Sequence, residues 1–193
     1  MGAIFQSLGR TVLAGVVLLV ILVLAVATSA GASHAWWTFF MRYLHVLCGV
    51  MWIGLLWYFN FVQIPSMPKI PDEQKPAISK VIAPTALFWF RWAAAATVLT
   101  GLLLAWMSGY IALALGVQRP FMAIGIGMWL ALVMAFNVWF IIWPNQKKAL
   151  GIVVVEAAEK AKAARLAMLT SRANTMLSIP MLFCMVAQQN GGL

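Results

Sequence analysis

The 193-residue sequence has few charged residues and almost no acidic ones. Charged residues make up 9% of the chain, and Asp and Glu together number 4 against 13 Lys and Arg. All the acids lie between the apolar runs: Asp72, Glu73, Glu156 and Glu159. Acid–base catalysis by paired carboxylates inside the protein is therefore not expected. The net charge of +9 would suggest nucleic acid in a soluble chain, but here it indicates basic loops on one membrane face and no nucleic-acid partner.

Cysteine, histidine and the motifs of soluble enzymes are also scarce. Cys48 and Cys184, the 2 cysteines, lie inside apolar runs and give no disulfide framework, no metal spacing and no CxxCH for covalent haem. The sequence contains no GxGxxG, no phosphate loop, no HExxH and no catalytic triad. The common classes of soluble enzyme therefore lack their motifs here.

Long apolar runs, by contrast, fill the chain. Hydrophobic residues make up 64% of it, and its mean hydropathy is +0.96. A transmembrane helix needs about 20 apolar residues, and lipid does not tolerate unpaired backbone groups. Because the runs do not alternate, they exclude a barrel and predict an all-α integral membrane protein. About five transmembrane helices are expected, at residues 11–30, 41–63, 82–107, 121–143 and 174–189. Pro144 ends the fourth and Pro180 breaks the fifth.

We interpret the chain as a single membrane domain with a four-helix core made of two repeated hairpins. Its parts are an N-terminal transmembrane helix within 1–35, a first hairpin at 36–110 and a second hairpin at 111–193. A cleavable signal peptide is the alternative for the first helix, because ATSA before Gly31 resembles a cleavage site. Residues 31–40 predict a short connection, and residues 145–173 predict a charged helix at the cytoplasmic membrane surface.

The distribution of Lys and Arg predicts the orientation in the membrane. One side carries ten of these residues: Arg10, Lys69, Lys75, Lys80, Lys147, Lys148, Lys160, Lys162, Arg165 and Arg172. The other side carries Arg42 and Arg119, while Arg91 lies within a span. The basic side is expected to be cytoplasmic. The N-terminus then lies in the cytoplasm and the C-terminus in the periplasm of a bacterial cytoplasmic (inner) membrane.

An internal similarity with an offset of 77 residues supports the two-hairpin interpretation. The recurring residues are Arg42, Met51, Trp52, Leu55, Phe59 and Asn60, which match Arg119, Met128, Trp129, Leu132, Phe136 and Asn137. In this register His45 falls opposite Met122. A repeat about an axis along the membrane normal would set these two side chains at one depth on facing helices.

Polar residues near the outer ends of these helices suggest a b-type haem. Ionisable groups in a span cost roughly 2.5–3.5 kcal/mol, so they face the protein interior and have a partner. The expected set is His45 as one ligand of the haem iron, Met122 as the other, Arg42 and Arg119 on the propionates, and Trp52 and Trp129 as walls. In the alternative, His45 is a core histidine bonded to a carbonyl, Met122 only packs, and the arginines reach the headgroups.

A second polar group lies toward the cytoplasmic ends. Its candidate substrate-binding residues are Arg91, Asn60, Asn137, Asn145, Gln146, Arg172, Asn174 and Ser178. They could form a pocket for an anionic or amide-bearing small molecule. The alternative is an interhelical hydrogen-bond cluster that holds the bundle together. Arg91 has no acidic partner in any span, which favours a ligand, a carbonyl cluster or a lipid phosphate.

Three runs carry a family resemblance: RYLHVLCGVMWIGLLWYFNFVQ, FNVWFIIWPNQKK and SRANTMLSIPM. They resemble the N-terminal membrane domain of the membrane-bound urate hydroxylase (PuuD) family over most of residues 36–187. The resemblance implies urate oxidation with electrons passed to a periplasmic cytochrome c. It also implies site candidates at His45, Trp143, Pro144, Asn145, Gln146, Ser171, Arg172, Asn174 and Ser178. The printed chain has no CxxCH, so a separate cytochrome or a loss of urate activity is expected. A looser resemblance is to HemJ-type protoporphyrinogen oxidases.

These observations lead to one main functional prediction and two alternatives. The main one is a haem-b electron-transfer protein or membrane oxidoreductase of urate-hydroxylase type, passing electrons toward a c-type cytochrome. The first alternative is a non-catalytic accessory subunit of a larger, respiratory-type membrane complex. The second, a transporter using the inner polar group, is weakened by the absence of an intramembrane carboxylate. Membrane lipid is the expected surrounding, and an oligomer is compatible with the sequence.

Overall fold

The computed structural model describes residues 2–27 and 30–190, and every regular element in those ranges is helical. The chain divides into two compact units, Met1–Phe40 and Met41–Leu193. The α-helices are α1 (Gly2–Phe5), α2 (Leu8–Val26), α3 (His34–Trp57), α4 (Ile64–Ser66), α5 (Lys75–Ala77), α6 (Ala83–Met107), α7 (Ile111–Leu115), α8 (Met122–Phe136), α9 (Trp143–Ala149) and α10 (Ala157–Asn190). Between them lie the π-helical segments η1 (Tyr58–Gln63), η3 (Ile78–Ile82) and η4 (Asn137–Ile142) and the 3₁₀ turn η2 (Met67–Lys69).

Helix α2 belongs to the first unit and is apolar all round. None of its residues is buried within the chain, as is typical of a helix surrounded by lipid. The candidate cleavage site at 27–30 falls partly outside the described residues. The predicted connection at 31–40 is shorter than expected, because α3 already begins at His34. Trp36 is therefore helical, and its ring stacks on Phe40 at 5.3 Å.

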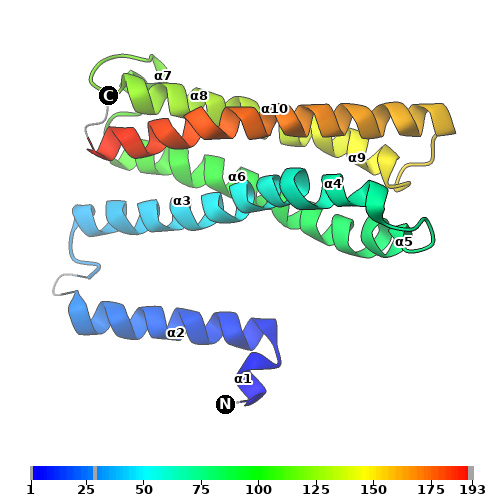
Figure 1. Ribbon diagram of the computed structural model, residues 1–193. Helices are drawn as coiled ribbons and strands as arrows, with labels where there is room; N and C mark the ends of the chain where they lie inside the picture. The colour runs from blue at the N-terminus through cyan, green and yellow to red at the C-terminus, as the bar shows by residue number, and fades with distance from the viewer. Residues whose placement is uncertain (1, 28–29, 191–193) are drawn as a thin grey trace. The chain divides into compact units, whose positions relative to one another are not determined.

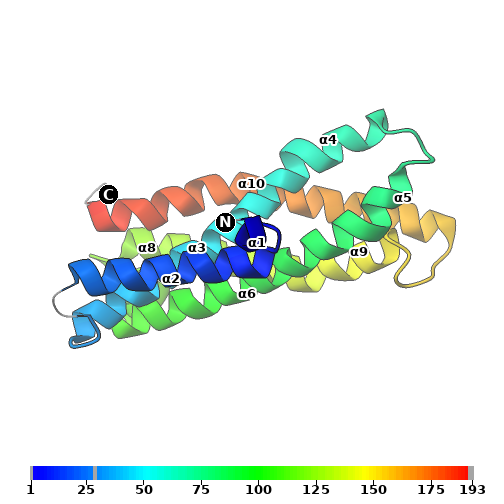
Figure 2. The ribbon, with the colours of Figure 1, turned by 90° about the horizontal axis from the view of Figure 1, so that it is seen from below.

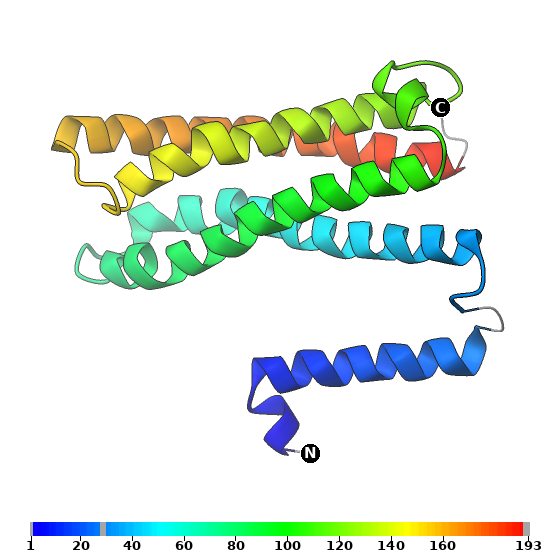
Figure 3. The same cartoon turned by 180° about the vertical axis from the view of Figure 1, so that it is seen from behind.

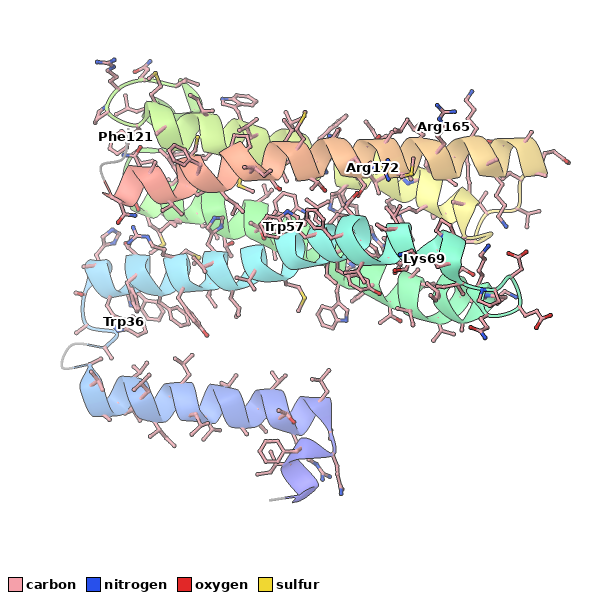
Figure 4. The ribbon with its side chains drawn as sticks, in the orientation of Figure 1. Trp36, Trp57, Lys69, Phe121, Arg165 and Arg172 are labelled. Carbon is pink, nitrogen blue, oxygen red and sulfur yellow. The ribbon has the colours of Figure 1, made fainter. Side chains whose placement is uncertain are left out.

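The second unit is an antiparallel four-helix bundle. Figure 1 shows that α3 and α8 run in one direction and α6 and α10 in the other, and Figure 3 shows the same order from behind. We call the end with α7 and the start of α8 the His45 end, and the end with the loops after α4 and α9 the basic end. In Figure 4, Phe121 marks the His45 end, while Lys69 and Arg165 mark the basic end.

Four helical stretches in the described ranges are long and apolar enough to cross a membrane. They are Leu8–Val26, His34–Lys69, Lys75–Met107 and Met122–Ala149. This confirms the prediction of an all-α membrane protein. The expected fifth span belongs to α10, the long helix that ends at the C-terminus in Figure 2. Helix α10 packs along α8 but is not among the four stretches that are apolar enough to cross a membrane.

Prolines do not end the long helices, contrary to the prediction for Pro144 and Pro180. Proline lacks an N–H and its ring clashes with the carbonyl four residues earlier. Segments η1, η3 and η4 each end two residues before a proline, and Pro65, Pro84 and Pro144 occupy the first turn of the following α segment. An N–H in that position needs no intrahelical partner, so each helix passes the proline. Helix α10 also continues through Pro180.

The predicted charged helix at 145–173 is two helices. Helix α9 ends at Ala149, and Gly151 follows with φ +75°, a left-handed conformation that favours glycine after a helix C-terminus. Helix α10 begins at Ala157 and carries the remaining charged residues into the bundle without interruption.

The core of the bundle lies where the four helices meet. Trp52 and Leu56 from α3 and Phe90 from α6 are almost completely buried, together with Met134 from α8. Phe59 in η1 meets Phe90 edge to face at 5.6 Å. Aromatic contacts of this kind stabilise a bundle where lipid provides no hydrophobic force between helices. The core thus separates the polar residues of the two ends.

Candidate functional site

A cavity of about 600 Å³ extends from the His45 end into the bundle. It is lined by residues of α3, α6, α8 and α10, and most of its wall is apolar. The polar lining residues are Arg42, His45, Thr97, Tyr110 and Asn190. The volume lies within the range of about 300–1,000 Å³ that is usual for cofactor and small-molecule sites.

The imidazole of His45 is fixed against α6 by one of its two nitrogens. Its Nδ1 lies 3.0 Å from the carbonyl oxygen of Thr97 and 3.3 Å from the hydroxyl of Thr100. A carbonyl only accepts, so Nδ1 carries the proton of the neutral ring and Nε2 keeps a lone pair. Nε2 has no hydrogen-bond partner among the described residues. The arrangement matches that of metal-binding histidines, whose second nitrogen donates to a carbonyl.

This position of the ring depends on Gly101. A Cβ at residue 101 would lie 2.8 Å from Cε1 of His45 and 3.1 Å from its Nδ1, which is too close. The absence of a side chain at Gly101 thus lets the imidazole lie on α6 within reach of Thr97. Gly101 is not among the residues predicted for the site, although a glycine inside the apolar run VLTGLLLAW is a signal for close approach.

Two further nitrogens of this region are buried without a partner. They are Nε of Arg42 and Nε1 of Trp52, and both side chains line the cavity. Buried N–H donors in proteins are normally satisfied, so these atoms indicate a missing acceptor. Tyr110 also lines the cavity and stacks on Phe121 at 4.9 Å. Burial raises the pKa of the Tyr110 phenol, while the charge of Arg42 opposes that shift.

The second-hairpin residues predicted for the same site lie elsewhere. Met122 and Trp129 are 42% and 49% exposed, Arg119 is exposed, and none of the three lines the cavity. Nε1 of Trp129 donates to the carbonyl of Leu115 at 3.0 Å. The repeat therefore does not place Met122 opposite His45. Other methionines line the cavity instead: Met128, Met181 and Met185.

Two glycines on α8 explain why Met122 and Trp129 do not line the cavity. A Cβ at Gly125 would lie 2.1 Å from the carbonyl oxygen of Ala114, and a Cβ at Gly127 would lie 3.0 Å from Cβ of Cys184. Helix α8 therefore packs closely against α7 and α10 through its glycines. Its large residues at 122 and 129 remain on the exposed side.

Four of the eight polar residues predicted for the inner group form hydrogen bonds from one helix to another. Asn137 Nδ2 donates to Asn174 Oδ1 at 2.8 Å, and Asn174 Nδ2 donates to the carbonyl of Met134 at 2.9 Å. Trp57, labelled in Figure 4, reaches from α3 to α10 and donates to Ser178 Oγ at 3.0 Å. These bonds fit the alternative in which the polar residues hold the bundle together.

Of the other inner candidates, Asn60 joins η1 to α10, whereas Asn145 bonds within its own helical stretch. Asn60 Nδ2 donates to Ser171 Oγ at 2.8 Å. Asn145 Nδ2 donates to the carbonyl of Ile141 within its own helical stretch at 2.8 Å. Gln146 lines a separate, smaller cavity, and Arg172 is exposed on α10. The structure therefore does not gather the predicted inner residues into one site.

Arg91 has an aromatic partner in place of an acidic one. Its guanidinium carbon lies 3.4 Å from the ring centroid of Trp143, and Nη1 donates to the carbonyl of Leu87 at 3.1 Å. A cation over an indole face is stabilised by the ring quadrupole, most strongly where water is excluded. The contact with Trp143 therefore stabilises a buried arginine that has no carboxylate partner.

Residues 112–191 match a family model described as urate oxidase N-terminal. The match covers α7 to α10, and thus most of the second hairpin, and supports the resemblance to urate hydroxylase membrane domains there. It does not include His45. No curated protein and no solved structure matches the chain. The looser resemblance to HemJ-type proteins stays a prediction.

Proposed function

We propose that this membrane protein binds one haem b in the His45 cavity and transfers electrons as a urate-hydroxylase-like oxidoreductase. The observation that carries the proposal is His45, whose Nδ1 is held by the Thr97 carbonyl while Nε2 stays free of protein partners. The family match over residues 112–191 supports the urate-hydroxylase type. Urate is the electron donor in this proposal, and a c-type cytochrome or a partner complex is the acceptor.

The residues around the cavity fit a haem in three respects. His45 offers a neutral imidazole nitrogen for the iron, with its tautomer fixed by Thr97. Arg42, which lines the cavity, offers an N–H without a partner, and a guanidinium suits a propionate. The apolar wall includes Gly49, which leaves room beside the helix, and the fully buried Trp52. A haem bound there would supply one-electron redox chemistry.

Each of these residues has a definite task in the proposal. The backbone carbonyl of Thr97 polarises His45 by accepting a hydrogen bond from Nδ1–H, which strengthens Nε2 as a ligand. Arg42 balances negative charge, and Trp52 excludes water from the inner wall. Met128 of α8 and Met181 and Met185 of α10 also line the cavity, and a thioether from one of them would raise the reduction potential if it held the iron with His45.

The position in the membrane follows from the basic end. Lysines and arginines gather in η2, α5 and η3, in α9 and in the first half of α10, so in this proposal the basic end faces the cytoplasm of a bacterial inner membrane. The His45 end then faces the periplasm, where an acceptor cytochrome would dock.

The accessory-subunit alternative has support from one observation. In the matched segment, Asn174 and Ser178 are buried. The polar atoms of both side chains form hydrogen bonds within the bundle. A subunit whose polar residues only stabilise the bundle would bind no haem.

Replacement of His45 separates the two proposals. We expect His45→Ala to lower the haem content of the detergent-purified chain at least tenfold, measured by the pyridine haemochrome assay. His34→Ala is the matched control, because His34 is the other histidine and is exposed in the first unit. Equal haem content in His45→Ala and wild type would reject the site, and haem-free folded wild type would favour the accessory subunit.

A further inference from the structure

Helix α10 carries a continuous stripe of exposed side chains along one face. Residues at alternating intervals of three and four share one face of a helix. We call the outer stripe the set of exposed residues Arg165, Leu169, Arg172, Met176, Ile179 and Phe183. The buried residues of the same helix, such as Ala163, Asn174 and Met181, lie on the opposite face, where α8 and α9 pack. The outer stripe therefore faces away from the other helices of the second unit.

The chemical character of the outer stripe changes within one helical turn. Its first part carries the cations Arg165 and Arg172, both labelled on α10 in Figure 4, and Lys162 is exposed one turn earlier. Its second part carries only large apolar side chains, from Met176, which is 65% exposed, to Phe183, which is 58% exposed. A change from cations to apolar side chains on an exposed face matches the boundary between lipid headgroups and hydrocarbon.

The two arginines of the outer stripe have no acidic partner. Neither Arg165 nor Arg172 forms an ion pair in the part of the chain that the structure describes. Glu159 is the last acid of the printed sequence, and its carboxylate pairs with Lys148. A negative group that balances these arginines must therefore come from outside the chain, and the guanidinium fork suits a phosphate.

The net charge of the occupant follows from the same absence of acids. A zwitterionic headgroup would bring its own ammonium group to a surface whose charges, at Lys162, Arg165 and Arg172, are all positive. Like charges at close range disfavour that arrangement. An anionic headgroup brings no opposing cation, so it complements this surface better.

A second copy of the chain does not complement the outer stripe. Copies of one membrane protein share one orientation, so a two-fold axis between them runs along the membrane normal and sets their α10 helices parallel. Arg172 of one copy would then lie at the same depth as Arg172 of the other. The stripe offers no acid to separate these charges.

The length of the apolar part fits one acyl chain of a lipid. From Met176 to Phe183 the helix rises about 10.5 Å, at 1.5 Å per residue. One leaflet contributes about 15 Å of the ~30 Å hydrocarbon layer, so this part lies within a single leaflet. Side chains on a helix lean toward its N-terminus, so the guanidinium of Arg172 extends toward the basic end and away from the apolar part.

We propose that the outer stripe binds one anionic phospholipid from the leaflet at the basic end. Its phosphate lies against Arg172 and Arg165, and one acyl chain follows Met176, Ile179 and Phe183. The site does not rest on haem binding, so failure of one proposal leaves the other unaffected.

Native mass spectrometry of the detergent-purified full chain tests this proposal. The probe is dioleoylphosphatidylglycerol, and dioleoylphosphatidylcholine has the same acyl chains on a zwitterionic headgroup. We expect saturable binding of one phosphatidylglycerol per chain and at least tenfold weaker binding of phosphatidylcholine. Excess inorganic phosphate should not displace the lipid, because the acyl chain contributes to binding. Absence of saturable binding, equal binding of both lipids, or displacement by phosphate would overturn the proposal.

Substitution then tests the place of binding. The double variant Arg165→Gln/Arg172→Gln removes two exposed charges and should weaken phosphatidylglycerol binding at least tenfold. Lys80→Gln/Arg119→Gln is the matched control, because it removes two exposed charges outside α10, and it should bind the lipid like wild type. Equal binding in the two double variants, with folding confirmed by circular dichroism, would overturn the proposal.

The apolar part is tested by Phe183→Ala, which should weaken phosphatidylglycerol binding severalfold. The substituted side chain is exposed, so the bundle core is unchanged. Unchanged lipid binding in this variant would overturn the position of the acyl chain. A dimer in the mass spectrum that Phe183→Ala dissociates would assign the outer stripe to a second copy and overturn the proposal.

Discussion

The two ends of the bundle keep different kinds of polar atom without a partner. Among the described residues that line the His45 cavity, these atoms are nitrogens: Nε2 of His45, Nε of Arg42 and Nε1 of Trp52. The hydroxyl of Ser108, which follows α6 but does not line the cavity, is also buried without a partner. Near the basic end they include the carboxamide oxygens of Gln63 and Gln146. A nitrogen lone pair and N–H donors suit an iron-bound, anionic cofactor, whereas carbonyl oxygens only accept hydrogen bonds. The polar atoms without a partner at the two cavities thus differ in the kind of hydrogen bond that they can form.

The largest effect is expected from a substitution at Gly101 that displaces the ring of His45. Gly101→Ala places a Cβ 2.8 Å from Cε1 of His45, so the ring must move away from Thr97. We expect the haem content per chain to fall at least tenfold. Alanine favours a helix over glycine by about 1 kcal/mol, so helix stability itself does not suffer.

The control for this change is Gly15→Ala in α2, where a Cβ would meet nothing within 4 Å. It should leave the haem content unchanged in the pyridine haemochrome assay. A Gly101→Ala chain that retains full haem would show that the contact with α6 does not position the ligand.

A second prediction concerns the residues between the two cavities. Asn174 is fully buried and joins α10 to α8 by two hydrogen bonds. Asn174→Ala should lower the free energy of unfolding in detergent by about 1–2 kcal/mol, because it removes both bonds and leaves Asn137 without its acceptor. Haem content should stay at the wild-type level. Asn145→Ala, which loses a bond within its own helical stretch, should cost less.

The smallest expected effect concerns Arg91 and Trp143. Loss of the cation–π contact in Trp143→Leu should cost about 1 kcal/mol of unfolding free energy, and Trp143→Phe should cost less. A double-mutant cycle with Arg91→Met measures the pair directly. A coupling energy of zero would mean that Arg91 has a different stabilising partner.

The sequence predicted the bundle better than it predicted the site. The length of the apolar runs is enough to predict the helices, and the basic loops are enough to group their ends. Helix termini at Pro144 and Pro180 were predicted wrongly, because π-helical segments and tertiary packing allow a helix to continue past proline. Sequence rules for proline describe isolated helices and not this packing.

The internal repeat predicted the relative direction of α3 and α8 correctly, but it did not predict the rotation of α8 about its own axis. Helices α3 and α8 do run in parallel, as the repeat predicts (Figure 1). Yet Trp52 is fully buried while its counterpart Trp129 is 49% exposed. The rotation of α8 follows from the close contacts of Gly125 and Gly127, which have no equivalent on α3 in the repeat register. Which side of α8 is buried therefore depends on close backbone contacts of its glycines, and the repeat does not contain these glycines.

Haem b in the His45 cavity is tested by a reduced-minus-oxidised absorption spectrum of the detergent-purified chain, with a pyridine haemochrome assay for stoichiometry. We expect a b-type spectrum with about one haem per chain, lost in His45→Ala and retained in His34→Ala. A chain that is folded by circular dichroism and carries no haem when purified from cells supplied with haem would contradict it.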